Sequence, residues 1–213
     1  SMDSAGTWTP QRGQVTCLDQ SVKFTLTDAG INTEPFNLNL AALTPLMTGG
    51  AQARGQVSGT FTSSPMSLEL NFNDAGLNKP PLFQVDSLNG RVTYSGDVWA
   101  MDNLVMRGTH SDCTINAKLQ GKQWQAKVEG DKLDLNTVMA IYGASQMMAE
   151  TPKTAGTTPT TSSAAPLAYE GEGTVAVKEI YLRRGVVHNA STRIQTTGNE
   201  IRFNDIQCRL GNG

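Results

Sequence analysis

Apolar and polar residues alternate along most of the chain, and this period of two is typical of β-strands with one buried and one wet face. The alternation is clearest in four runs, at residues 22–26, 36–40, 66–72 and 113–119. After the last of these runs, the Gly121-Lys122 turn leads into another, at residues 124–128. The two runs predict a hairpin with a polar outer face. The sequence therefore predicts an all-β fold with a long curved antiparallel sheet, either an open groove or a partial barrel or sandwich.

One segment departs from this period. Leu135, Val138, Met139 and Tyr142 recur at the spacing of one helix face, and Asp134 is placed to cap the helix. We expect one accessory helix near residues 134–149.

A segment rich in Thr, Ser, Pro and Ala follows the predicted helix at residues 151–168. Such a composition buries too little apolar surface to offset the ordering of its backbone, so we interpret it as a flexible linker. The linker separates a main β-sheet region, 1–150, from a C-terminal block, 169–213. We expect this block of three strands to pair with the main sheet, because three short strands make a poor independent core.

The C-terminal block contains two changes of phase. Apolar residues change parity between Val177 and Ile180, and again between Phe203 and Ile206. A single extra residue in a strand produces such a change, so the sequence predicts a β-bulge at each place.

Composition and charge narrow the possible functions. Apolar residues make up 38% of the chain, charged residues 17%, and the formal net charge is −2. This balance lacks the basic footprint of a nucleic-acid-binding protein, so we expect no nucleic-acid partner.

Cysteine and histidine are scarce. The chain has three cysteines and two histidines, without a CxxC pair, so we predict no metal site. Cys113 and Cys208 are in phase with neighbouring strand hydrophobes. We interpret both as buried small apolar side chains in preference to a disulfide.

The sequence lacks the familiar catalytic motifs GxSxG, HExxH, GxGxxG and the P-loop. Asp97 and Asp102 flank Trp99, and two acids beside an aromatic ring are found in glycosidase clefts. However, Asp near a strand end is more commonly a turn residue. We therefore predict a non-enzymatic protein without a cofactor.

The second half of the chain, about residues 85–213, resembles AsmA-like proteins. The resemblance lies in GRVTYSGDVWAMDNLVMRG, the hairpin DCTINAKLQG and WQAKVEGDKLDLN, and the block GTVAVKEIYLRRGVVHNASTRIQTTGNEIRFNDIQCRLGNG. These motifs consist of glycine and aliphatic spacing, and Leu133-Asp134-Leu135 occupies the place where the family opens a helix. Residues 1–84 share only the general strand rhythm.

The resemblance implies a Gram-negative envelope protein that is anchored in the inner membrane and extends into the periplasm. It also implies a link to lipid transport or outer-membrane assembly, with phospholipid or lipopolysaccharide acyl chains as partners. The chain has no run of about 18 apolar residues to serve as the anchor. We therefore expect it to be a periplasmic segment of a longer protein.

A curled sheet with one helix leaves part of its apolar face for apolar ligands. The residues that we predict to face lipid are Ile115, Leu119, Trp124, Val128, Val175, Val177, Ile201 and Phe203. The first alternative is a scaffolding module that recruits envelope protein partners by adding a strand to an open sheet edge. The second is a carbohydrate-binding β-sandwich that uses Trp8, Trp99 or Trp124 as a stacking platform.

Overall fold

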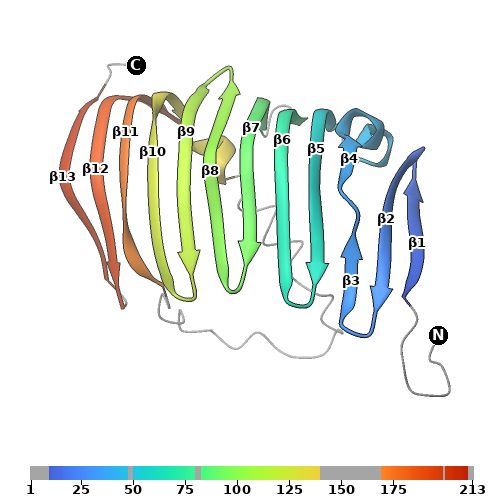
Figure 1. Ribbon diagram of the computed structural model, residues 1–213. Helices are drawn as coiled ribbons and strands as arrows, with labels where there is room; N and C mark the ends of the chain where they lie inside the picture. Colours follow the sequence, from blue (N-terminus) through green and yellow to red (C-terminus); the bar gives the residue numbers. More distant parts are fainter. Residues whose placement is uncertain (1–9, 48–49, 80–82, 140–168, 199, 211–213) are drawn as a thin grey trace, which may run out of the picture.

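The protein is a single open β-sheet, bent along its length (Figure 1). The computed structural model describes residues 10–47, 50–79, 83–139, 169–198 and 200–210. The strands are β1 (Gln11–Cys17), β2 (Gln20–Thr27), β3 (Gly30–Thr33), β4 (Phe36–Asn39), β5 (Gln52–Ser63), β6 (Met66–Lys79), β7 (Phe83–Ser95), β8 (Val98–Gly108), β9 (Ser111–Gln120), β10 (Gln123–Asp134), β11 (Glu170–Leu182), β12 (Gly185–Thr197) and β13 (Glu200–Leu210).

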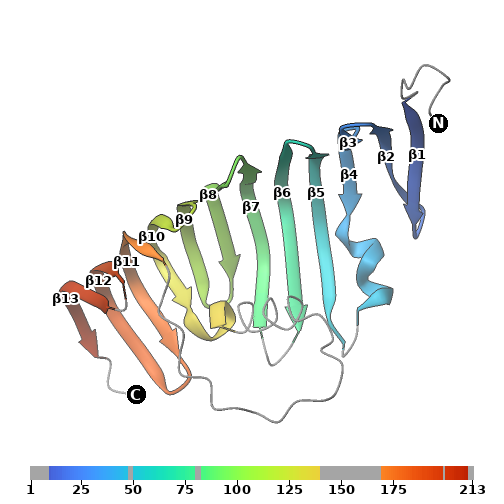
Figure 2. The ribbon, with the colours of Figure 1, turned by 90° about the horizontal axis from the view of Figure 1, so that it is seen from below.

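Two short helical segments accompany the sheet. The 3₁₀ helix η1 (Leu40–Leu46) follows β4, and a helix that begins at Leu135 is described as far as residue 139. Figure 2 shows both on the same side of a single layer of strands. The predicted all-β fold with an accessory helix after Asp134 is confirmed. The sequence analysis does not predict η1, and the rest of the predicted helix and the linker at 151–168 lie outside the described residues.

The strands follow one another across the sheet in chain order, except that β4 continues in line with β3, and both pair with β5 (Figure 1). Neighbours are antiparallel, as predicted, with one exception between β10 and β11. There the chain leaves β10 at Asp134 and re-enters the sheet at Glu170, which pairs with Gln123 at the start of β10. A return to the same end of the neighbouring strand makes the pair parallel. Through this pair, β11 to β13 continue the main sheet.

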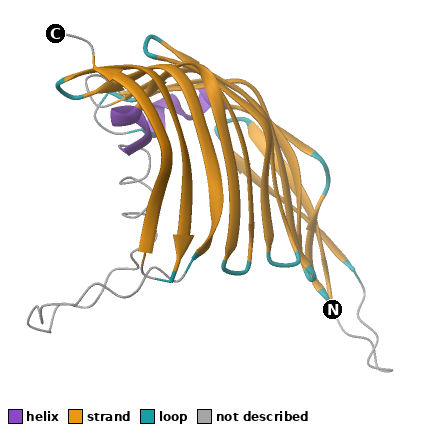
Figure 3. Ribbon diagram, turned by 90° about the vertical axis from the view of Figure 1, so that its left-hand side faces the viewer, coloured by secondary structure: helices purple, strands orange, loops and turns teal. Residues whose placement is uncertain are grey.

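A series of β-bulges crosses the sheet. Four Asn or Asp residues with positive φ lie where the register between strands shifts: Asp74 (50°), Asn103 (47°), Asn189 (51°) and Asp205 (53°). Asn and Asp tolerate this conformation better than other residues with a side chain. Bulges bend the strands that carry them, and Figure 3 shows the strands bending over the helical segments.

A bulge explains one of the two predicted changes of phase. On β13, Asn204 and Gln207 pair with Arg193 and Ser191 of β12, so β13 carries one extra residue, beside Asp205. On β11, Val177 and Ile180 contact the same apolar cluster although their positions differ in parity. The predicted bulge on β13 is therefore confirmed, whereas the register of β11 shifts against neither β10 nor β12, so the bulge predicted there is not seen in its pairing.

The core lies on the inner face of the bend, beneath the helix at 135–139. Its buried members come from five different strands: Val85, Met106, Cys113, Leu133 and Val177. Val138 of the helix packs against this cluster, and Thr137 is almost fully buried. The helix therefore seals part of the apolar face of the sheet.

Asp134 fixes the start of this helix. Its Oδ1 accepts a hydrogen bond from the backbone N–H of Asn136 at 2.9 Å, and its Oδ2 accepts one from the hydroxyl of Thr137 at 2.8 Å. Burial opposes the charged form, but together these hydrogen bonds hold the pKa of Asp134 below its ordinary value. The predicted capping role of Asp134 is confirmed.

The three cysteines have different environments. Cys113 is 2% exposed in the core, as predicted, whereas Cys208 is exposed on β13, so its predicted burial is wrong. The reason is that β13 is the last strand of the sheet and nothing among the described residues covers it. Burial, together with the nearby Asp112 carboxylate, raises the pKa of the Cys113 thiol to about 11.

Thiol labelling at pH 8 tests these environments. Cys17 and Cys208 are expected to react with a maleimide at ordinary rates. Cys113 is expected to react at least about a hundredfold more slowly, since a pKa near 11 leaves about one thiol in a thousand ionised and burial blocks access. Mass spectrometry of digested protein gives the rate at each site. Equal labelling of all three without denaturant would contradict the packing of this core.

Candidate functional site

The inner, apolar face of the sheet has two parts. We call the part around Met106, Cys113 and Leu133, which the helix at 135–139 covers, the closed half. We call the part around Met101, Leu119 and Trp124 the open half. Met106 is 4% exposed whereas Met101, on the same strand and the same face, is 38% exposed. The difference shows that no described element covers the open half.

The open half contains a groove over β8, β9 and β10, with a volume of about 470 Å³. Cross-strand pairing brings its residues together, because Trp99 pairs with Leu119, which pairs with Trp124. We call this site the open groove; its main lining residues are Trp99, Met101, Ala117, Leu119, Trp124 and Tyr169. Among its described lining residues, Lys118 alone carries a charge.

Aromatic rings extend the open groove toward β7. Tyr94 pairs with Trp99 across β7 and β8, and the centroids of their rings are 4.7 Å apart at a tilt of 40°. Leu68 of β6 pairs in turn with Tyr94. Large side chains therefore continue along the face at right angles to the strands.

Trp124 closes the other end of the groove. Its indole N–H donates a hydrogen bond to the Thr196 hydroxyl at 2.7 Å, so the ring crosses β11 to reach β12. Glycine makes this crossing possible, because a Cβ on Gly173 would lie 2.8 Å from ring atom Cζ3 of Trp124. The only polar atom of the ring is thereby satisfied, and the ring presents apolar surface to the groove.

The eight residues predicted to face lipid share the apolar face but not one site. Val177 is buried in the core, and Ile115, Val128 and Val175 pack against it. Leu119 and Trp124 line the open groove, whereas Ile201 and Phe203 lie exposed on β13.

Sequence reasoning missed Trp99, Met101 and Tyr169 as groove residues. Trp99 and Met101 share a parity, but their neighbours Val98 and Ala100 are also apolar, so the sequence gives no clear alternation at this point. Asp97 lies in the turn before β8 with a φ of 69°, consistent with the interpretation of this acid as a turn residue. Of the three tryptophans of the carbohydrate hypothesis, Trp8 lies outside the described residues, Trp124 is held over β11, and Trp99 is 41% exposed.

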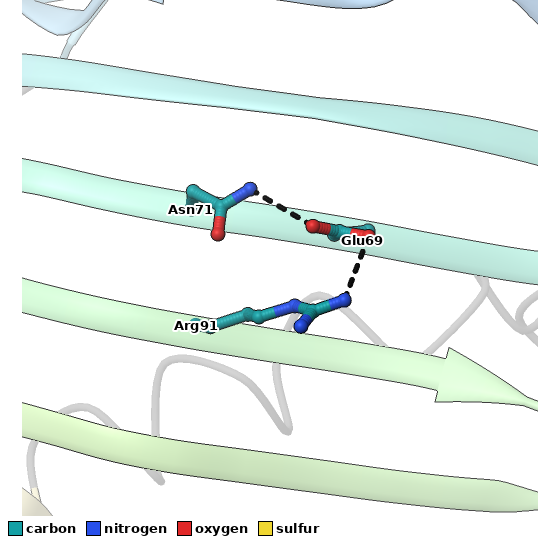
Figure 4. A network of polar contacts seen from close by, with 3 residues as sticks. All are labelled: Glu69, Asn71 and Arg91. Atoms are coloured by element: carbon teal, nitrogen blue, oxygen red, sulfur yellow. Dashed lines mark hydrogen bonds and ion pairs between the residues drawn. The ribbon is translucent and has the colours of Figure 1, made fainter.

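The outer face of the sheet is polar and its charges pair across strands. Glu69 on β6 forms an ion pair with Arg91 on β7 at 2.9 Å (Figure 4). Hydrogen bonds from Asn71 and from Arg91 lower the pKa of Glu69. Glu172 and Arg193 form a similar pair between β11 and β12, and the hydrogen bond from Arg193 lowers the pKa of Glu172.

A second hollow, of about 560 Å³, lies on this outer face beside the parallel pair. Glu172 and Arg193 line it and form an ion pair with each other, and Asp102, Lys118 and Lys127 also line it, so this hollow is too charged for the acyl chain that the sequence predicts as ligand. The described residues include no group of three His, Cys, Asp or Glu side chains that could hold a metal ion. The open groove is therefore the strongest candidate site.

Comparison with protein-family models, with curated proteins and with solved structures finds no match for this chain. The resemblance to AsmA-like proteins therefore stays a prediction. Within the described ranges, none of the helices is long and apolar enough to cross a membrane.

Proposed function

We propose that the protein is a periplasmic segment of an AsmA-like envelope protein, and that it presents an apolar sheet face to the acyl chains of phospholipid or lipopolysaccharide. In this role it contributes to lipid transport or outer-membrane assembly without catalysis. The observation that supports the proposal best is the open groove, an apolar surface that no described element covers.

The chemistry of the open groove suits a hydrocarbon chain. Each CH₂ group buried there contributes about 0.8 kcal/mol, and the groove offers Trp99, Met101 and Leu119 as contacts. A soluble protein rarely leaves neighbouring large apolar side chains exposed without a binding role.

Native mass spectrometry, before and after organic extraction, tests this function. We expect a co-purifying mass that matches phospholipid and is lost on extraction, and we expect the extracted protein to take up a fluorescent fatty acid. Met101→Asp places a charge in the open groove and is expected to weaken uptake at least about tenfold, because burial against the ligand would desolvate the carboxylate.

Ala100→Asp is the matched control. Ala100 neighbours Met101 on β8 but faces the outer side of the sheet, so the same charge there is expected to leave uptake unchanged. Circular dichroism checks that both variants fold. A wild-type protein that carries no lipid and takes up no fatty acid would refute the proposal, and so would equal uptake by the two variants.

A further inference from the structure

β13 forms one end of the sheet, and its outer edge pairs with no strand in the part of the chain that the structure describes. Its apolar side chains are unusually exposed: Ile201 by 46%, Phe203 by 56%, Ile206 by 63% and Leu210 by 76%. An edge strand offers a row of free backbone N–H and C=O groups, and natural proteins usually protect such an edge with charges or bulges that prevent further pairing. β13 does carry one bulge, beside Asp205, and charges on its outer face, but its inner face is an apolar row without a charge.

β1 at the opposite end of the sheet is different. On its inner face the residues are Gln11, Gly13, Val15 and Cys17, so Val15 is the only large apolar side chain there. The ring of Phe24 on β2 fills the space above Gly13, where a Cβ would lie 2.3 Å from it. The two ends of the sheet therefore do not offer equivalent surfaces.

The bulge beside Asp205 makes β13 complementary to itself. Before the bulge the apolar face carries odd-numbered residues, Ile201 and Phe203, and after it even-numbered ones, Ile206 and Cys208. Consider two antiparallel copies of β13 related by a two-fold axis at the Asn204–Asp205 bond. Ile201 then lies opposite Cys208 of the other copy, and Phe203 opposite Ile206, all on the apolar face. In a strand without a bulge, the same pairing of odd with even positions would place opposite faces together.

The charges fit the same register. With the axis at Asn204–Asp205, Glu200 of each copy lies opposite Arg209 of the other, so the pairing gives two opposite-charge contacts. Moving the axis one bond toward the C-terminus puts Arg202 opposite Arg209, which is a like-charge contact. Moving it one bond toward the N-terminus puts Phe203 opposite Asn204, which joins an apolar position to a polar one.

We propose that β13 is a self-association edge, at which a second copy of this chain adds its own β13 in antiparallel register about a two-fold axis at Asn204–Asp205. Such a contact is isologous and closes as a dimer, because each copy uses its single β13 edge. The inner faces of the two sheets then join into one apolar surface. In it, the exposed row on each β13 lies beside the same row of the other copy. This inference is independent of the lipid-binding proposal, since it concerns the sheet edge and not the open groove.

Charge reversal with sedimentation velocity tests the partner and the register. The full chain is expected to sediment as a dimer that dissociates on dilution. Arg209→Glu and Glu200→Arg each place like charges across the axis and are expected to weaken the dimer at least about tenfold. The double variant E200R/R209E restores opposite charges at both contacts and is expected to regain the wild-type dimer. Glu200 also pairs with Arg202 in its own strand at 2.8 Å, and the double variant removes that pair too, so recovery depends on the contact between copies.

Arg12→Glu on β1 is the matched control, and it is expected to leave the dimer intact. A wild-type protein that stays monomeric at about 100 µM, a concentration at which even weak self-association with a Kd near 10⁻⁴ M is visible, would overturn the proposal. So would a double variant no better than the single ones, or a dimer that Arg12→Glu breaks.

A disulfide provides a second, register-specific measurement. In a Cys17→Ser background, Ile201→Cys is expected to form a covalent dimer with the native Cys208 of the other copy. Within one chain these positions are seven residues apart on an extended strand, about 23 Å, which is too far for a disulfide. Phe203→Cys faces Ile206 in the proposed register and is expected to stay monomeric under denaturing conditions. Equal cross-linking by both variants, or by neither, would overturn the register.

Discussion

Met106→Ala is expected to lower the free energy of unfolding by about 2–5 kcal/mol, the cost of a cavity in a well-packed core. Met106 is 4% exposed and contacts the cluster that joins β7, β9, β10 and β11 beneath the helix. Loss of its side chain removes contacts between the main sheet and the C-terminal strands at the same time. Denaturant unfolding monitored by circular dichroism measures the effect.

Met101→Ala is the control, because Met101 has the same side chain on the same strand and the same face. It lies 38% exposed in the open groove, so its loss is expected to cost less than about 1 kcal/mol. If the two variants are equally destabilised, the open half is packed in solution and the division of the apolar face is wrong. If neither is destabilised, the core is not where the structure places it.

The strands and their faces are the part of this fold that can be predicted from the sequence. The hairpin of β9 and β10 has the predicted turn, and the pair Leu119 and Trp124 lies on the predicted face. The change of phase in β13 marks a bulge. Local alternation suffices here, because side-chain direction along a strand depends only on position.

The arrangement of these strands depends on contacts that local patterns do not encode. The parallel pair of β10 and β11 requires the chain to return to the start of β10, and no local pattern near Glu170 specifies this. Burial is equally non-local. Val175 and Val177 share a face and a strand, yet only Val177 is fully buried, because the cluster beneath the helix ends between them.

The open groove shows the same limit. Its wall combines Trp99, Leu119 and Trp124 from three strands, and their alignment follows from register. The bulge at Asn103 shifts β8 relative to β9, so Met101 and Leu104, three positions apart, pair with Ala117 and Ile115, which are only two positions apart. Without this shift, Trp99 and Met101 would face the outer side of the sheet. An Asn next to an Asp is too common in turns and loops to reveal the bulge from sequence.

The affinity for single-chain phospholipids is expected to rise steeply with acyl length if the open groove binds hydrocarbon. Each added CH₂ contributes about 0.8 kcal/mol, which corresponds to about a fourfold tighter Kd per carbon. The rise is expected to stop when the chain outgrows the groove of about 470 Å³, because further carbons stay in water. Displacement of a fluorescent fatty acid by lysophospholipids of increasing length, below their micelle concentrations, measures this series.

The slope of this series separates the possible ligands of the sheet. A headgroup-driven site would give Kd values that change with the headgroup and stay constant with chain length, which would contradict binding in the open groove. A carbohydrate platform on Trp99 would bind sugars and give no slope at all. Met101→Asp is expected to flatten the slope, since its charge interrupts the apolar path between Trp99 and Ala117. Ala100→Asp is expected to leave the slope unchanged, because the outer face of β8 makes no contact with a chain in the open groove.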